Sequence, residues 1–216
     1  MKNGETPDQE WSRKELQLLK PLSSPEAIQC FLDAIPYNSK ATCRSPQRVL
    51  HDRTANCTEG ALFAAAALRL IGEPPLLIDL RAVRDDDHVI APFRRRGRWG
   101  ALSKSNFSGL RYRSPVFRSI ESLAHSYFDQ FFNLKRELSL RSFSRPMNLA
   151  GKRFAGWQFR RDELDDICDH LDTFKHWPIL DKGAERELRR VDDRLYKSAL
   201  LGSVREGLYG FERAGQ

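Results

Sequence analysis

The sequence predicts an α+β fold, in which helices come first, antiparallel strands follow and helices return near the end. Residues 24–35 and 56–70 carry helix start signals and apolar side chains at helical spacing. Residues 76–102 instead divide into short apolar runs separated by turn residues. Helices and strands that are segregated along a chain indicate an α+β arrangement rather than alternating βαβ units.

The early helices have clear N-terminal signals. Residues 24–26 (Ser-Pro-Glu) supply a cap, a first-turn proline and a first-turn acid, and residues 45–46 (Ser-Pro) repeat the signal. The clearest helix runs from Asn56 or Cys57 to about residue 70, with Glu59 in its first turn. Its many alanines allow close packing against a sheet.

The strands follow this helix. We expect strands over residues 76–80, 88–93 and 99–102, with a turn at 85–87 and a hairpin tip at 94–98. The pattern over residues 107–117 is ambiguous, and a further strand is one interpretation.

A further helix and the division of the chain complete the expected organisation. Ser119 is expected to cap a helix whose apolar face continues to Phe131. We divide the chain into a loosely ordered lead-in over residues 1–20, a core over 21–150 and a helical C-terminal extension over 151–216 that packs on the core.

Composition limits the classes of protein. No apolar run approaches the ~20 residues that a membrane span needs. The polar first twenty residues lack a signal core, which predicts a cytoplasmic location. Residues 81–120 hold ten basic and three acidic side chains, so this segment alone accounts for the net charge of +7. The basic segment either attracts an acidic partner or decorates exposed strands.

Cofactor and metal motifs are missing. The four cysteines, at positions 30, 43, 57 and 168, form no CxxC pair, which predicts free thiols and no zinc site. We expect Cys30 to pack in the core, and Cys168 to lie beside the apolar face of a helix. The acidic cluster over residues 162–172 is typical of a solvated helix face, so no metal and no cofactor is expected.

Cys57 is the strongest candidate for chemistry. A cysteine in the first turn of a helix lies at the positive end of the helix dipole, which favours the thiolate. The free N–H groups of that turn can hold an oxyanion beside the sulfur. A thiol nucleophile also needs a base, and His88 opens a strand at a sheet end from which it can reach back. The alternative is an inert, buried thiol.

The order of these residues resembles the transglutaminase-like superfamily. Residues 53–72 (RTANCTEGALFAAAALRLIG) look like the nucleophile helix of that family. The strand that begins His88-Val-Ile matches the strand of the catalytic histidine, and residues 97–103 (GRWGALS) match the strand of the third catalytic residue. The resemblance covers about residues 44–107. It implies a papain-like core and cysteine-dependent acyl transfer, in which peptide or amide bonds are cut, side chains are deamidated, or glutamine is joined to amines.

The third position departs from the family. Ser103 stands where the family has an aspartate, and Asn106 is the alternative for orienting the imidazole. Residues 103 and 106 face opposite sides of a regular strand, so Asn106 would need a bulge or turn. We therefore expect Cys57 as nucleophile, His88 as general acid and base, and Ser103 or Asn106 as the third residue.

The expected reaction is hydrolysis, ahead of transfer, of a peptide or side-chain amide through a thioacyl intermediate. The arginine-rich segment makes an acidic peptide or protein substrate plausible. The competing hypothesis is a catalytically degenerate member that keeps the fold as a binding module. Its arginine-rich surface would then bind an acidic protein or a nucleic acid.

Overall fold

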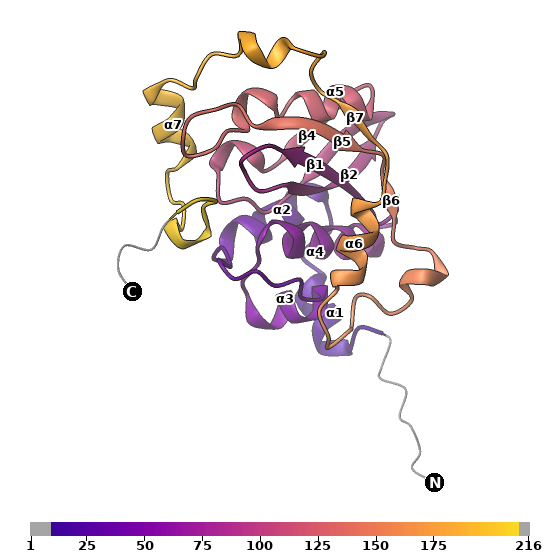
Figure 1. Cartoon of the computed structure of the whole chain (residues 1–216). Helices are drawn as coiled ribbons and strands as arrows, with labels where there is room; N and C mark the ends of the chain where they lie inside the picture. Colours follow the sequence, from indigo (N-terminus) through magenta and orange to yellow (C-terminus); the bar gives the residue numbers. More distant parts are fainter. Residues whose placement is uncertain (1–9, 212–216) are drawn as a thin grey trace.

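A computed structural model describes residues 10–211 and has an α+β architecture, with helices on both faces of an antiparallel sheet (Figure 1). The helices are α1 (Arg13–Leu19), α2 (Pro25–Ala34), α3 (Pro46–Asp52), α4 (Cys57–Leu70), α5 (Ile120–His125), α6 (Asp165–Asp172) and α7 (Asp193–Ala199). The strands are β1 (Leu76–Ala82), β2 (His88–Arg95), β3 (Arg98–Leu102), β4 (Arg113–Phe117), β5 (Leu140–Ser144), β6 (Met147–Asn148) and β7 (His176–Pro178).

The sheet has the strand order β4-β3-β2-β1-β5-β7, and the short β6 pairs with the free end of β1. Every pairing between these strands is antiparallel. The β2–β3 hairpin turns at Arg96 and Gly97, whose φ angles of 48° and 77° lie in the left-handed region that suits the twist of a tight hairpin. The hairpin tip expected at 94–98 is therefore confirmed.

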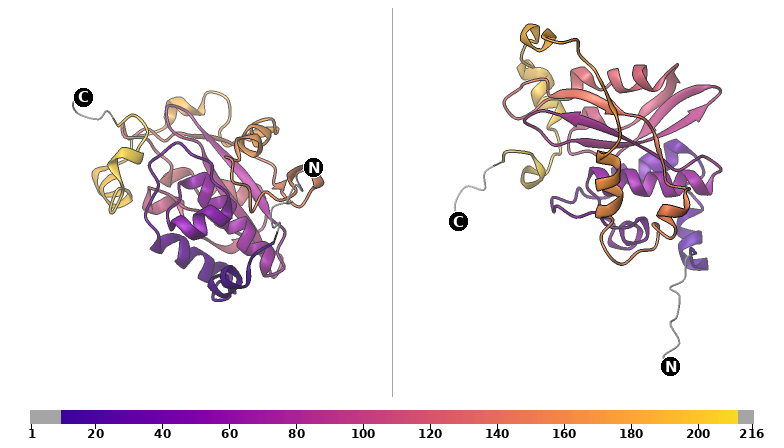
Figure 2. Two further views of the ribbon diagram at one scale, coloured as in Figure 1. Left: turned by 90° about the horizontal axis from the view of Figure 1, so that it is seen from below. Right: turned by 45° about the vertical axis from the view of Figure 1, so that its right-hand side comes forward.

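The core is split by the sheet (Figure 2). One face packs against α4, α2 and α6, while α3 packs on α4, and the other face is covered by α5. Helix α4 is buried on nearly all sides from Glu59 to Leu68, because its alanines admit close neighbours. Gly60 allows the closest approach, since a Cβ there would lie 2.2 Å from the Cβ of Lys104.

Three strands of the sheet, β5, β6 and β7, are not expected from the sequence. Strand β5 pairs with β1, and β7 pairs with β5, so the sheet extends beyond the expected hairpins. The run Leu-Arg-Ser-Phe-Ser of β5 does not alternate between apolar and polar residues, so it gives no strand signal. Its polar residue Ser144 can be buried because Ser144 Oγ accepts a hydrogen bond of 2.9 Å from the N–H of Asp79. The ambiguous stretch 107–117 forms a 3-10 turn (Ser108–Leu110) followed by β4.

The two ends of the chain also differ from expectation. Within the expected loosely ordered lead-in, α1 is a capped helix that buries Glu15 and Leu19, while residues 1–9 lie outside the described part. The C-terminal extension is not wholly helical, because β7 belongs to the sheet. The helix expected from Ser119 to Phe131 ends at His125 and is followed by a short 3-10 helix, Phe128–Gln130.

Helices within residues 10–211 do not combine the length and apolarity that crossing a bilayer requires. The longest of them, α4, has 14 residues.

Candidate active site

The N-terminus of α4 is fixed by a capping box. The Asn56 side chain accepts a hydrogen bond from the N–H of Glu59 (2.9 Å), and the Glu59 carboxylate accepts one from the N–H of Asn56 (3.0 Å). Asn56 also donates from its side chain to the carbonyl of Thr42 (2.6 Å). Cys57 is therefore the first residue of the helix, as the sequence predicts, and its backbone position is held from both sides.

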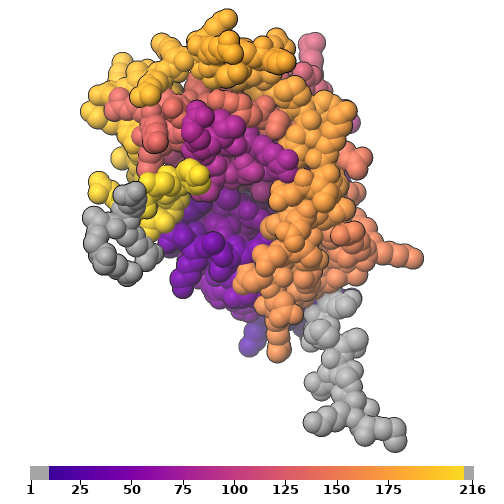
Figure 3. All heavy atoms as spheres, viewed as in Figure 1, coloured from indigo at the N-terminus to yellow at the C-terminus, as the bar shows by residue number. Residues whose placement is uncertain are grey.

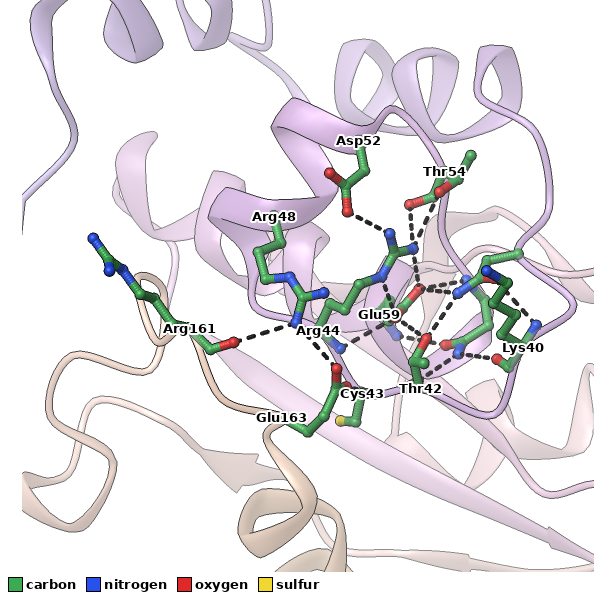
Figure 4. A network of polar contacts seen from close by, with 12 residues as sticks. Lys40, Thr42, Cys43, Arg44, Arg48, Asp52, Thr54, Glu59, Arg161 and Glu163 are labelled. Carbon is green, nitrogen blue, oxygen red and sulfur yellow. Dashed lines mark hydrogen bonds and ion pairs between the residues drawn. The ribbon is translucent and has the colours of Figure 1, made fainter.

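Glu59 anchors this cap in the protein interior (Figure 4). Its fully buried carboxylate receives hydrogen bonds from Arg44 Nε and Nη2 (2.8 and 2.9 Å), from the Thr42 hydroxyl (2.7 Å) and from the Asn38 amide (3.1 Å). Burial opposes ionisation, but these donors prevail and lower the pKa of Glu59. We call Asn38, Thr42, Arg44, Asn56 and Glu59 the capping network. Of these residues, only Asn56 and Glu59 are marked by a local sequence signal.

Cys57 opens onto a cavity of about 500 Å³. The wall of this cavity is formed by residues 37–43, the start of α4, the turn before β2, two residues of α6 (Asp165 and Cys168) and residues 206–209 near the C-terminus. Figure 3 shows this yellow C-terminal segment lying on the surface beside the earlier, purple part of the chain. A smaller cavity of about 40 Å³ adjoins Cys57 and His88 together.

The surroundings of Cys57 favour the thiol over the thiolate. Burial is the main influence and raises the pKa of Cys57, against hydrogen bonds from the Thr58 side chain and from the N–H groups of Thr58 and Val89 that favour the thiolate. The helix-dipole expectation of a lowered thiol pKa is therefore not met, because the cost of burying a thiolate outweighs the donors at the helix end.

His88 lies at the first position of β2, where the sequence analysis put it, and is buried. Its Nε2 is 2.9 Å from the carbonyl oxygen of Leu110, and because a carbonyl only accepts, Nε2 carries the proton. In the neutral ring, Nδ1 is then the unprotonated nitrogen, which can act as an acceptor. Burial lowers the pKa of His88 to about 4. The Cys57 sulfur lies 4.0 Å from the carbonyl oxygen of Asp87, the residue next to His88.

Ser103 and Asn106, the two alternatives for the third position, make different hydrogen bonds. The buried Ser103 hydroxyl donates to Leu110 O (2.7 Å), the same carbonyl that receives His88 Nε2. Ser103 thus contacts the imidazole's partner rather than the imidazole. Asn106 pairs through both ends of its amide with the backbone of Val204, at 2.7 and 2.8 Å, and so holds the C-terminal segment instead of His88.

Tyr37 is a site residue that the sequence analysis missed. Its side chain lies beside the thiol of Cys57 in both cavities, and burial, followed by the nearby Cys57, raises the pKa of Tyr37. The backbone bridge between Tyr37 and Ala55 fixes this position next to the start of α4. No local pattern marks Tyr37, because the contact joins a loop to a helix end twenty residues later.

The arginine-rich hairpin is remote from this site. Arg95 and His88 are at opposite ends of β2, roughly 20 Å apart at the usual rise of a strand. Arg94 lies over the ring of Trp99, and Arg95 forms an ion pair with Glu73. Charged side chains that line the larger cavity are one lysine, Lys40, and four acids, namely Asp86, Asp87, Asp165 and Glu206. The acidic-substrate hypothesis thus has no arginine of the hairpin beside Cys57 to support it.

Two further features from the sequence are the thiol of Cys30 and the question of a metal site. Cys30, expected in the core, is exposed on the outer side of α2, because Ile28 and Leu32 take the buried positions. In residues 10–211, histidine, cysteine and acidic side chains do not gather into a group of three or more that could hold a metal ion.

Comparison with known proteins gives no relative. No protein-family model matches the chain, and a search of curated proteins finds no significant match. Functional inference therefore depends on the geometry of Cys57 and His88.

The buried His88 is expected to make stability depend on pH. Its pKa is about 4 in the folded protein against 6.5 for the free side chain, so in this range the unfolded chain binds a proton that the folded protein does not. The stability associated with a neutral His88 is fully present above pH 6.5. As the pH falls toward 4, the free energy of unfolding decreases by about 3 kcal/mol on this account. Asp79 and Asp85, whose pKa values burial raises to about 6, act with the opposite sign.

The measurement is therefore a difference between two proteins. Urea unfolding of wild type and His88→Gln, whose amide can still donate to Leu110 O, is followed between pH 7 and pH 4. Between pH 7 and pH 4, we expect the free energy of unfolding of wild type to fall by about 3 kcal/mol more than that of His88→Gln. Parallel pH dependences in the two proteins would contradict a buried, neutral His88.

Proposed function

We propose that the protein is a cysteine-dependent acyl-transfer enzyme of the transglutaminase-like type, which cleaves or transfers peptide or side-chain amide bonds. The observation that carries the proposal is that Cys57 and His88 line one cavity, and that the bond from His88 Nε2 to a carbonyl makes Nδ1 the unprotonated, basic nitrogen of the ring. The packing of α4 against an antiparallel sheet agrees with the papain-like core that the sequence resemblance implies.

The chemistry begins from a neutral pair. As the Cys57 sulfur attacks the substrate carbonyl carbon, the thiol proton passes to His88 Nδ1, and the carbonyl electrons move to oxygen as an oxyanion. N–H groups at the start of α4 are the donors for that oxyanion. The imidazolium then gives its proton to the leaving nitrogen as the C–N bond breaks, which leaves a thioester on Cys57.

The second half returns the enzyme to its starting state. Water or an amine attacks the thioester carbon and loses its proton to His88 Nδ1, and the thiolate departs and is reprotonated. The carbonyl of Leu110 takes the place of the family's aspartate: it orients the ring and fixes its tautomer, and Ser103 supports it. A carbonyl supplies no full negative charge, so we expect a slower enzyme than one with the aspartate.

A test that assumes no substrate uses a broad peptide pool in heavy-oxygen water. Hydrolysis of any peptide or side-chain amide places heavy oxygen in the new carboxyl group, and hydroxylamine in place of water gives hydroxamates. We expect wild-type protein to form both products and, after acid quenching, to carry the acyl group on Cys57 in the peptide map. Acidic and basic peptides in one pool also measure the charge preference directly.

The competing function is a degenerate binding module, and one observation favours it. Within residues 10–211 no carboxylate is bonded to His88, and burial lowers the pKa of His88, so the imidazolium that catalysis requires is disfavoured. Exposed Arg94 and Arg96 at the hairpin tip would then provide the binding surface for an acidic protein.

If the pool yields no labelled product and no acyl-Cys57, the enzyme proposal fails. Salt-sensitive binding of an acidic polypeptide that is lost on Arg94→Glu and Arg96→Glu would then support the module.

A further inference from the structure

Two thiols that take no part in the proposed reaction lie in contact. Cys43, in the loop before α3, and Cys168, in α6, are 125 residues apart in the chain, yet their sulfur atoms are 3.0 Å apart. A disulfide bond is about 2.05 Å long, so the two sulfurs need to approach by only about 1 Å to be joined.

The two segments are held together by more than the thiols. The N–H of Leu164 donates to the carbonyl of Cys43 (2.7 Å), and the N–H of Cys43 donates to the carboxylate of Glu163. Glu163 is in turn paired with Arg48 at 3.0 Å. These contacts keep the Cys43 backbone beside the start of α6, so the sulfurs remain neighbours without help from a covalent bond.

The surroundings of the two sulfurs differ. Cys43 is buried, whereas Cys168 is partly exposed, and both line the cavity of about 500 Å³ that also holds Cys57. A small oxidant entering this cavity therefore meets Cys168 first. The hydrogen bond with Cys168 and then burial raise the pKa of Cys43, so Cys43 is disfavoured as the thiol that makes the first attack.

We propose that Cys43 and Cys168 form a reversible disulfide site whose oxidant is a small-molecule disulfide of the glutathione type. The Cys168 thiolate attacks one sulfur of the oxidant and releases one glutathione thiolate, giving a mixed disulfide on Cys168. The Cys43 thiolate then attacks the Cys168 sulfur and releases the second glutathione. Two electrons pass from the protein thiols to glutathione disulfide, and the two thiol protons go to solvent or to the released thiolates.

The bond would tie α6 to the capping network. Thr42 and Arg44, on either side of Cys43, both donate to Glu59 beneath the N-terminus of α4. Oxidation would therefore brace the wall of the cavity next to Cys57 without using the Cys57 thiol. This inference stands on the Cys43–Cys168 geometry alone and is independent of the proposed acyl transfer.

The experiment treats reduced, full-length protein with glutathione disulfide, followed by non-reducing peptide mapping. We expect one linked peptide pair, Cys43 with Cys168, while Cys30 and Cys57 remain free, and we expect dithiothreitol to reverse the link. The oxidised form should melt about 10 °C above the reduced form, since closing a long loop stabilises the folded state.

Matched variants give the direction of the exchange. Cys43→Ser should trap glutathione on Cys168, because the resolving thiol is gone, and Cys30→Ser should form the Cys43–Cys168 link like wild type. The proposal is overturned if wild type yields only glutathione adducts, remains fully reduced, or links Cys57 instead. Because peptide mapping reads the bond directly, absence of amide turnover in the same preparation does not affect the result.

Discussion

Replacing Cys57 by alanine is expected to lower amide turnover by roughly a thousandfold or more, because it removes the sulfur that forms the thioacyl intermediate in the proposed reaction. Cys57→Ser should also be severely impaired: its hydroxyl is a poorer nucleophile than a thiol, and the neutral His88 cannot compensate. The measurement is the initial rate of heavy-oxygen incorporation into the best substrate from the peptide pool.

The matched control is Cys30→Ala, which removes an exposed thiol on α2 and should leave the rate unchanged. Thermal melting of all variants separates loss of chemistry from loss of fold. A Cys57→Ala protein that keeps more than about a tenth of the wild-type rate would show that the nucleophile is elsewhere.

Arg44→Ala is expected to destabilise the protein by about 3–5 kcal/mol, because it leaves the buried Glu59 carboxylate without its cationic partner. The Arg44 side chain is 10% exposed and that of Glu59 is 0% exposed, so water cannot replace the guanidinium. The same guanidinium also bonds Asp52 (2.6 Å) and the Thr54 carbonyl (3.0 Å). Because Glu59 caps α4, we expect Cys57 to be displaced and turnover to fall as well.

Arg48→Ala is the control for this variant. Arg48 lies nearby and pairs with Glu163, but both side chains are more than a third exposed, so its loss should cost about 0–1 kcal/mol. Urea unfolding at neutral pH compares the two variants, and equal destabilisation would contradict the capping network as the anchor of α4.

The pH dependence gives a second check on Arg44→Ala. In wild type the lowered pKa of Glu59 contributes stability above the ordinary value of 4.5, which is lost as the pH falls. Without Arg44, fewer donors oppose the effect of burial, so we expect the pKa of Glu59 to rise and its neutral form to be less costly to bury than the carboxylate. The deficit of the variant should therefore shrink as the pH is lowered.

The sequence by itself determined the elements whose signals are local. Asn56 and Glu59 form the capping box that starts α4, the alanines give its close packing, and the left-handed Arg96–Gly97 turn closes the β2–β3 hairpin. These features depend on residues within a few positions of one another, so propensity and spacing were sufficient. They also fixed where Cys57 and His88 stand, at the start of a helix and the start of a strand.

Tertiary structure decided what those two residues contact. Which oxygen binds His88, whether Ser103 or Asn106 serves it, and that Tyr37 lies beside Cys57 all depend on loops brought together from distant parts of the chain. The same holds for the electrostatics: the helix end favours a thiolate at Cys57, and only the folded environment shows that burial prevails. Local patterns set backbone conformation, whereas desolvation and long-range hydrogen bonds exist only once the chain has packed.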